Sequence, residues 1–533
     1  MTEVLDITEA PASPAPTPRP RVGFVSLGCP KNLVDSEVMM GLLDRAGAQI
    51  TADAASADIL VVNTCSFIDK AKQESVDAIL EMARLKTGGS ARRLIVAGCL
   101  VERYRDEIQK NIPEVDAVVG TGELESILEA AGLAPSQAPA STSPFNILSG
   151  SATVRPGVES RSGTHQEFRP EGDRREEQGR FLRTAWDGAT PQLPQYLYDH
   201  TTPRLRTTRS ASAYIKIAEG CDHPCTFCVI PNLRGKFRSR RFESVIAEAE
   251  ALVAEGVREI TLIGQDTTCY GEDLDIKDGL ALLLDRLAQI PGLTWLRFLY
   301  AYPNRITGKL LQTIAKHDNI CKYLDVPLQH AAIPVLKSMK RGGGAEIFLK
   351  TIAKVRASVP GIALRTSFIV GFPGETDADF EALCDFVAEV KFDWLGVFSY
   401  SDEEGSRSID LATKVPKRVI EQRRRALMKL QKGLSRQAKR AQIGHTFDVL
   451  VEGESAETPL LWEGRTQFHA PEIDGTVYLN DFGPFEELKP GRFYRCEVTE
   501  AHDYDLVARV LSESEVANPA AVEPVLAEIG AAL

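Results

Sequence analysis

Apolar and polar residues alternate between two kinds of segment along most of the chain. Short apolar runs rich in β-branched residues occur at 21–29, 57–65 and 92–99, with helical periodicity between them. Farther along, similar runs are separated by helical stretches such as 244–256 and 378–390. Strands that alternate with helices form parallel sheets built from βαβ units. The pattern therefore predicts an α/β protein.

The α/β pattern divides into two units. The three runs in the first hundred residues predict an N-terminal domain with an open parallel sheet over 21–131. Repeating strand–helix units over 192–440 predict a partial (β/α) barrel. Its expected strands lie at 258–266, 293–303, 323–330, 361–376 and 394–401.

The pattern changes again near residue 441. Short strand-like runs separated by turn residues predict a small antiparallel β-barrel over 441–512. Three segments lack apolar periodicity and are rich in Pro, Ser, Gly or Ala. We expect a disordered N-terminus (1–20), a flexible insertion (132–191) and a C-terminal tail (513–533).

Composition agrees with a folded protein and excludes some classes. Of 533 residues, 43% are hydrophobic and 26% charged, which rules out a mainly disordered or fibrous chain. No apolar run approaches the roughly 18–20 residues that span a bilayer. The N-terminus lacks the basic and apolar regions of a secretory signal. We expect a cytoplasmic protein with reduced thiols and no membrane partner.

Six of the ten cysteines form two groups of three. Cys29, Cys65 and Cys99 each follow a predicted parallel strand, at the sheet edge where α/β proteins bind ligands. We call them the N-terminal trio. Cys221, Cys225 and Cys228 form C-x-x-x-C-x-x-C after the strand-like segment 213–218, and we call them the central trio. Isolated cysteines usually fill cores, which is our expectation for Cys269, Cys321, Cys384 and Cys496.

Three converging thiolates suit a soft metal centre. A structural zinc site needs four ligands, and a catalytic one needs three plus water. No histidine accompanies the N-terminal trio at ligand spacing. His223 lies inside the central loop, but it is better placed to orient the loop, or to be exposed, than to ligate. We therefore favour an iron–sulfur cluster with one open iron at each trio.

The central trio resembles the signature of the radical S-adenosylmethionine (radical SAM) superfamily, C-x-x-x-C-x-aromatic-C, with Phe227 as the aromatic residue. The resemblance implies a 4Fe–4S cluster whose open iron binds the amino and carboxylate groups of SAM. Electron transfer then cleaves SAM to a 5′-deoxyadenosyl radical, which abstracts hydrogen from an unactivated carbon. An electron donor is therefore an expected partner.

Several polar residues toward the carboxyl ends of the predicted strands are candidates for binding SAM. The expected carboxyl ends carry Gln265, Asp266, Gln329, His330, Arg365 and Glu375. The segment 368–376 resembles the glycine-rich segment of the superfamily, although Gly-Phe-Pro-Gly is also an ordinary turn sequence. Its Gly371 and Gly374 permit close backbone approach. We predict cofactor contacts for Phe227, Gln265, Gln329, Arg365, Gly371 and Glu375.

The three units in this order resemble the methylthiotransferases, whose C-terminal barrel is a TRAM domain. The resemblance implies that the N-terminal trio holds a second 4Fe–4S cluster involved in delivering sulfur. SAM then supplies both a methyl group and the radical. Because hydrogen abstraction by the radical requires no acid or base, we assign no catalytic residue beyond the two clusters.

Two branches of this family differ in substrate. One modifies isopentenyladenosine in tRNA; the other methylthiolates an aspartate β-carbon in the small-subunit ribosomal protein S-twelve. The segments 26–37, 218–225 and 464–475 look like the second branch, since the tRNA branch usually reads Gly-Cys-Gln-Met-Asn around the first cysteine. We predict the protein-modifying activity, on S-twelve either free or within the subunit.

Charge supports the same branch. The chain has a net charge of −12, and residues 441–511 contain 14 acidic and 5 basic residues. Phosphate binding relies on Lys and Arg, so an acidic barrel disfavours tRNA and favours a basic protein. The alternatives are the tRNA enzyme and a non-catalytic iron–sulfur factor on the ribosome. The basic helix expected over 419–440 is interpreted as a solvated face, with contact to RNA or the ribosome as the alternative.

Overall fold

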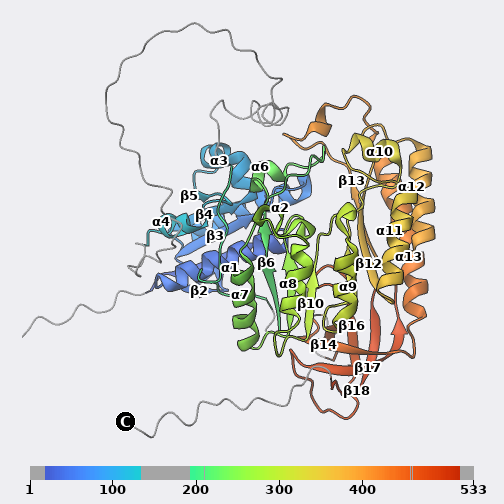
Figure 1. The fold of residues 1–533 in the computed structure, drawn as a ribbon. Coiled ribbons are helices and arrows are strands. Elements are labelled where there is room, and N and C mark those ends of the chain that lie inside the picture. Colours follow the sequence, from blue (N-terminus) through green and yellow to red (C-terminus); the bar gives the residue numbers. More distant parts are fainter. Residues whose placement is uncertain (1–18, 134–192, 209–210, 457, 459, 516–533) are drawn as a thin grey trace, which may run out of the picture.

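The computed structural model describes residues 19–133, 193–208, 211–456, 458 and 460–515. The predicted disordered N-terminus, flexible insertion and C-terminal tail lie almost entirely outside these residues. The described chain forms three units, an N-terminal sheet domain, a central barrel and a small C-terminal barrel (Figure 1).

The N-terminal domain is an open sheet of five parallel strands in the order β2-β1-β3-β4-β5. The central strand β3 is buried along its whole length, because helices cover both faces of the sheet. The strands are β1 (Arg21–Ser26), β2 (Gln49–Thr51), β3 (Ile59–Thr64), β4 (Arg93–Gly98) and β5 (Ala117–Val119), and the helices are α1 (Pro30–Arg45), α2 (Asp69–Gly88), α3 (Cys99–Asn111) and α4 (Ile127–Ala130). The predicted open parallel sheet is confirmed.

The central unit is a partial barrel of parallel strands in sequence order. Two three-stranded sheets, β6-β9-β10 and β11-β12-β13, are joined by a parallel bridge between Leu296 and Ile320. Among the described residues no pairing closes the barrel between β6 and β13. The strands are β6 (Ser212–Lys216), β9 (Glu259–Ile263), β10 (Trp295–Phe298), β11 (Tyr323–Asp325), β12 (Ala363–Val370) and β13 (Trp394–Ser399).

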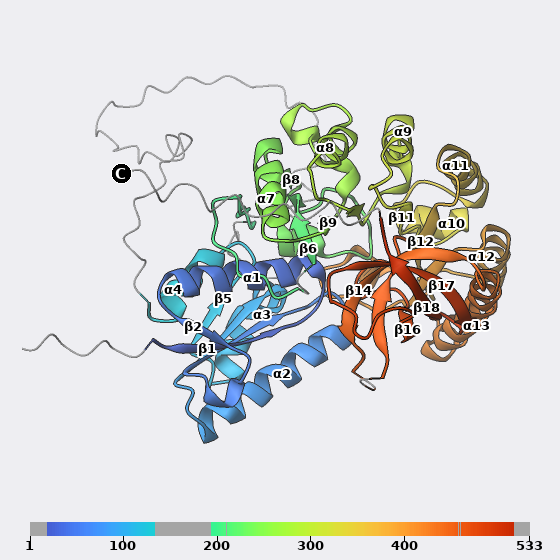
Figure 2. The same cartoon turned by 90° about the horizontal axis from the view of Figure 1, so that it is seen from below.

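Helices surround the central strands on the outside (Figure 2). Their apolar faces and the outer faces of the strands form one continuous core, in which Ile260, Leu262, Phe368 and Val370 are fully buried. The long helices are α7 (Phe242–Ala254), α8 (Gly279–Leu287), α9 (Gly308–Lys316), α11 (Ala345–Ser358) and α12 (Asp377–Val390), with two short ones, α6 (Ile230–Arg234) and α10 (Ile333–Ser338). The arrangement confirms the predicted partial (β/α) barrel.

The C-terminal unit is a closed barrel in the order β14-β15-β16-β18-β17. Its pairings are antiparallel except for β16 with β18, which is parallel. A closed ring with an odd number of strands cannot alternate direction throughout, so one parallel pair is unavoidable. The predicted small antiparallel β-barrel is confirmed, with one parallel pair that the sequence did not indicate. The strands are β14 (Thr446–Glu454), β15 (Trp462–Arg465), β16 (Val477–Asp481), β17 (Phe493–Ala501) and β18 (Leu506–Glu513).

The basic helix α13 (Lys417–Arg440) joins the two barrels. Lys432 and Arg436 form ion pairs with Asp503 of the C-terminal barrel at 2.5 Å. Lys439 is buried with its Nζ 3.9 Å from the centre of the Trp394 ring. Part of the positive charge of this helix therefore serves contacts within the chain, while Arg425 on its outer face is exposed.

The C-terminal barrel covers the amino ends of the central strands. Glu259, the first residue of β9, is fully buried and pairs with Arg297 at 3.2 Å and with Arg465 of β15 at 2.6 Å. Trp394, which begins β13, donates its indole N–H to the Phe468 carbonyl at 2.8 Å. Burial alone raises the pKa of a carboxyl, but Arg465 and Arg297 lower the pKa of Glu259 to about 2. The opposite, carboxyl edge of the central barrel is left for function.

We predict that Glu259→Gln destabilises the protein by about 3 kcal/mol at pH 7, because two buried guanidinium groups lose the carboxylate that neutralises both of them. Since folding depresses the pKa of Glu259, its contribution is present above the unfolded value and is lost as pH falls toward the folded value of about 2. In urea unfolding, the free energy of unfolding should fall more steeply for the wild type than for the variant between about pH 5 and pH 3. Glu346→Gln, which breaks an exposed ion pair with Lys350, is the control and should change the free energy of unfolding little.

No helix within the described residues is both long and apolar enough to cross a lipid bilayer.

Candidate functional site

The N-terminal trio lies at one edge of the sheet, as predicted. Cys29 immediately precedes α1, Cys65 follows β3, and Cys99 begins α3 after β4. Because β1, β3 and β4 are adjacent parallel strands, their carboxyl ends meet at one edge. Gly28 has a φ of +96°, and a Cβ there would lie 2.8 Å from the Cys65 Cβ. Glycine thus lets the first two cysteine segments approach closely.

The central trio lies on the loop between β7 (Ala218–Glu219) and α6. All three cysteines are half-buried. The loop is anchored from within, since the Thr226 amide donates to the Met339 carbonyl at 3.1 Å and its hydroxyl to the Ser338 carbonyl at 2.9 Å. These contacts hold the cysteines at the carboxyl edge of the central barrel.

Both trios fit a wide, positively charged metal centre better than a single ion. Zinc–sulfur bonds of about 2.3 Å hold sulfurs roughly 4 Å apart. Among the described residues, the side chains close enough to hold a single ion, with ligand atoms within 4.8 Å of one another, belong to neither trio. Burial raises the pKa of Cys99 and of Cys221 to about 12. A bound metal centre is what would keep such thiols ionised.

Two arginines act on the sulfurs directly. Arg234 donates to the Cys99 Sγ at 3.4 Å, and Arg341 donates to the Cys225 Sγ at 3.5 Å. A guanidinium stabilises a thiolate by its charge and its hydrogen bond. Each trio therefore has one cationic donor beside a sulfur, although burial outweighs Arg234 and leaves the pKa of Cys99 raised.

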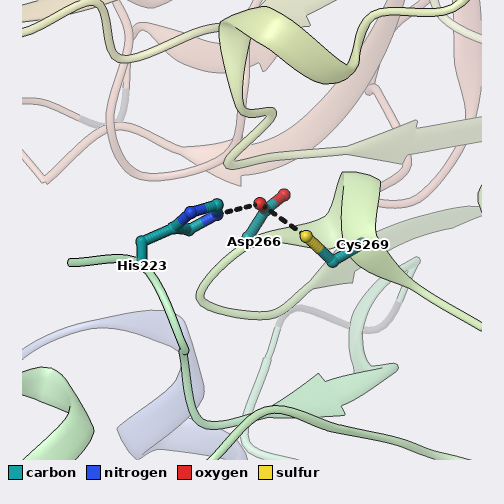
Figure 3. Close-up of side chains that lie close together, drawn as sticks. All are labelled: His223, Asp266 and Cys269. Atoms are coloured by element: carbon teal, nitrogen blue, oxygen red, sulfur yellow. Dashed lines mark hydrogen bonds and ion pairs between the residues drawn. The ribbon is translucent and has the colours of Figure 1, made fainter. Parts of the chain in front are cut away.

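The compact group consists of His223, Asp266 and Cys269 (Figure 3). His223 Nε2 lies 2.6 Å from Asp266 Oδ2, and the Cys269 thiol donates to the same oxygen at 3.0 Å. The His223 ring also stacks on Tyr302, with ring centres 3.9 Å apart. Hydrogen bonds thus account for this closeness, and His223 orients the central loop, the first of the two roles considered for it.

A buried group of four charged residues joins the N-terminal domain to the central barrel, and we call it the interface quartet. It consists of Asp35 from α1, Lys216 from β6, Glu219 from β7 and Arg234 from α6, each with a side chain at most 4% exposed. Arg234 lies 2.6 Å from Asp35 and 3.2 Å from Glu219, and Lys216 bridges the same two carboxylates. Despite burial, Lys216 and Arg234 hold the pKa of Glu219 below its usual range.

The quartet couples the two cysteine segments mechanically. Arg234 follows the central trio by six residues, and it contacts the sulfur of Cys99 in the other domain. Removing one member of the quartet leaves its partners buried without a counter-charge, so the four groups hold one another in place. The position of one trio relative to the other is thereby fixed by the fold.

Comparisons with known proteins agree with this arrangement. Three family models match the chain, namely "Uncharacterized protein family UPF0004" at residues 21–120, "Radical SAM superfamily" at 215–387 and "TRAM domain" at 443–511. A relative from Koribacter versatilis named "Ribosomal protein uS12 methylthiotransferase RimO" is 66% identical, over 92% of this chain and 96% of its own. One from Solibacter usitatus with the same name is 53% identical, over 95% and 97%. This chain belongs to the RimO family of radical SAM methylthiotransferases.

Membership of this family makes the chain an enzyme that uses SAM and two 4Fe–4S clusters. Among solved structures, the chain is similar to the radical SAM methyltransferase TsrM from Kitasatospora setae, with 15% identity, 73% of this chain and 74% of that chain covered, and a TM-score of 0.46.

The glycine-rich segment forms a turn directly after β12. Gly371 has a φ of +78°, and a Cβ there would lie 2.3 Å from the Ile420 side chain. Glu375 is buried and accepts hydrogen bonds from the amides of Gly371 and Phe372, the second at 3.1 Å. Its carboxylate therefore shapes the turn from behind. Gly374 has open space around its α-carbon.

Other predicted SAM-binding residues lie in the central loop and just beyond two strands, β9 and β11. Phe227 packs with Ile369 and Tyr400 against the cluster of buried side chains around Phe372. Gln265, just after β9, donates to Glu219 of the interface quartet at 2.5 Å and has a buried Oε1 without a partner among the described residues. Gln329, after β11, has a φ of +72° and bridges to Phe368.

Arg365 lies elsewhere, which corrects its expected position. It is the third residue of β12 and not at the carboxyl end of that strand. Its guanidinium pairs with Asp325 at 3.0 Å and with Asp474 of the C-terminal barrel at 3.4 Å. The sequence could not show that two carboxylates from other elements draw this side chain toward the domain boundary, and we no longer assign it to SAM.

Sequence reasoning missed the interface quartet, Arg341 and Tyr302. A signal existed for Lys216, since a lysine interrupts the apolar segment 213–218 and a buried lysine needs a partner. No signal existed for Arg341, because only the fold brings the segment after α10 next to Cys225.

Proposed function

We propose that this enzyme adds a methylthio group to the β-carbon of an aspartate in the ribosomal protein uS12, in the cytoplasm. The observation that carries the proposal is the pairing of two cysteine trios across one rigid domain interface, with Arg234 contacting Cys99. The names of the two relatives support uS12 as the substrate.

We assign the six cysteines to the two clusters. Cys221, Cys225 and Cys228 hold the cluster that binds SAM, and Cys29, Cys65 and Cys99 hold the auxiliary cluster on the sulfur side. When bound, SAM and its cluster supply a radical that removes a hydrogen atom from the substrate carbon, once an electron donor has reduced the cluster. The chain contributes the geometry: Thr226 anchors one loop, and Gly28 lets the other cysteine segments close together.

The proposed partner matches the charge of the C-terminal barrel. Ribosomal proteins are basic, and residues 441–511 carry nine more acidic than basic residues. Opposite charge accelerates encounter and favours correct partners. A tRNA substrate would instead need Lys and Arg on the surface of this barrel. We place the reaction in the cytoplasm, where ribosomes assemble and thiols stay reduced.

Mass spectrometry of a deletion strain tests the proposal. We expect uS12 to lose a single methylthio group per molecule in that strain, while the modification pattern of tRNA stays the same. Expression of the wild-type chain should restore the group, and expression of Cys225→Ala should not. Loss of methylthio groups from tRNA with uS12 unaltered would show that the tRNA branch is correct. Unaltered uS12 and tRNA, without 5′-deoxyadenosine formation by the purified protein, would favour the non-catalytic factor.

A further inference from the structure

Lys31 reaches from the N-terminal domain onto the carboxyl edge of the central barrel. It lies in the first turn of α1, two residues after Cys29. Its Nζ is 3.4 Å from the Gly264 carbonyl, just beyond β9, and 3.3 Å from the centre of the Tyr300 ring, just beyond β10. The residue is 8% exposed. A cation is therefore held where the auxiliary trio meets the barrel.

This cation has no carboxylate partner in the described part of the chain. No acidic oxygen there lies within ion-pair distance of Lys31, whereas Lys216 and Arg234 nearby share Asp35 and Glu219. A carbonyl and an aromatic face compensate only part of the cost of burying an ammonium group. The Tyr300 hydroxyl and the Cys29 sulfur also interact with Lys31. A buried cation without a carboxylate partner at this edge is suited to receive an anionic ligand.

The residue beneath Lys31 has a strained backbone. Tyr300 has a φ of +64°, a left-handed conformation that costs an aromatic residue about 1–2 kcal/mol. Hydrogen bonds hold it there, since its amide donates to Asp325 Oδ2 at 3.0 Å and its carbonyl accepts from the Thr267 amide at 3.2 Å. Such strain persists where the surrounding structure requires one orientation, and it concentrates at functional sites. Here it sets the aromatic face under the ammonium group.

If the proposed function is right, two carboxylates must enter this region. One belongs to SAM and the other to the target aspartate. Lys31 and Arg341 are two cations at this edge that form no ion pair with an acidic residue among the described residues. Arg341 contacts Cys225 and the Pro327 carbonyl, so it lies on the SAM side. Lys31 lies beside Cys29 on the auxiliary side. The carboxyl group of the aspartate is bonded directly to the carbon that is modified.

We propose that Lys31 binds the side-chain carboxylate of the substrate aspartate and so holds its β-carbon between the two cysteine trios. This inference rests on the proposed function. It makes Lys31 a residue that selects an aspartyl side chain over neutral side chains. The Tyr300 ring and the Gly264 carbonyl keep the ammonium group oriented before the substrate binds.

The test compares Lys31→Met and Lys31→Arg with the wild type, all reconstituted with iron and sulfide. For Lys31→Met we expect the KM for uS12 to rise about 10- to 100-fold, the size of losing a charge-assisted contact. The affinity for SAM and the formation of 5′-deoxyadenosine without uS12 should stay within about twofold, since the central trio is untouched. The KM of Lys31→Arg for uS12 should lie between those of the wild type and Lys31→Met. Lys350→Met, on an exposed helix pair, is the matched control.

A substrate variant completes the test. The wild type should bind uS12 with its target aspartate replaced by asparagine about 10- to 100-fold more weakly than native uS12, whereas Lys31→Met should bind both alike. Equal KM values for wild type and Lys31→Met would overturn the inference. Weaker binding of SAM with an unchanged KM for uS12 would assign Lys31 to the carboxylate of SAM and also overturn it. If Lys31→Met does not fold, the inference is equally overturned by wild-type enzyme that binds the asparagine substrate as well as native uS12. A wild type that leaves uS12 unmodified would instead reject the proposed function.

Discussion

Cys225→Ala is expected to abolish reductive cleavage of SAM, whereas Cys65→Ala is expected to leave that cleavage intact and abolish only methylthio transfer. The two cysteines belong to different trios on different domains, and each trio has its own cationic donor. Losing one thiolate of three removes the cluster that the trio holds. We expect at least a 10³-fold loss of 5′-deoxyadenosine for Cys225→Ala, and a change of less than about threefold for Cys65→Ala.

Iron content separates the two clusters in the same proteins. After anaerobic reconstitution we expect about eight irons per wild-type chain and about four in each variant, since each cluster contributes four. Cys384→Ala, which removes an isolated half-buried cysteine, is the control and should retain about eight. A wild type with about four irons, unaffected by Cys65→Ala, would contradict the assignment of the N-terminal trio.

Arg234→Met is expected to destabilise the protein by about 3–5 kcal/mol, because it leaves Asp35 and Glu219 buried with only Lys216 to share. The side chain is 3% exposed, so water cannot replace the lost guanidinium. Urea unfolding measures the loss. The substitution should also shift the spectroscopic signature of the auxiliary cluster, since Cys99 loses its hydrogen-bond donor.

Two further variants make this prediction specific. Arg424→Met breaks an exposed pair with Glu421 and should cost less than about 1 kcal/mol. The double variant Arg234→Met/Asp35→Leu removes the Asp35 carboxylate together with its guanidinium partner. It should recover part of the stability that Arg234→Met loses. A loss for Arg234→Met no larger than that for Arg424→Met would show that the interface quartet does not stabilise the fold.

Much of this architecture could be predicted from local patterns. Apolar runs with helices between them indicate parallel strands, and this pattern alone identified both α/β units. The same reasoning placed Cys29, Cys65 and Cys99 at strand ends, because parallel strands bring their carboxyl ends to one edge. Such features depend on neighbours in sequence and on the handedness and direction of βα units.

Arg365 and the C-terminal barrel show where local patterns fail. The sequence placed Arg365 at a strand end because strand limits are uncertain by several residues. Its true partners, Asp325 and Asp474, are 40 and 109 positions away in sequence. The direction of β18 relative to β16 is likewise decided by closure of the whole barrel.

The fold class, the order of the three units and the two cysteine trios can therefore be predicted from the amino-acid pattern, because periodicity and ligand spacing are properties of short segments. The contacts between the N-terminal domain and the central barrel, in contrast, arise only in the folded protein. The interface quartet joins residues up to 199 positions apart, and Lys31 meets Gly264 across 233. Charges that far apart in sequence become partners only after the domains pack, when burial removes water as the alternative partner.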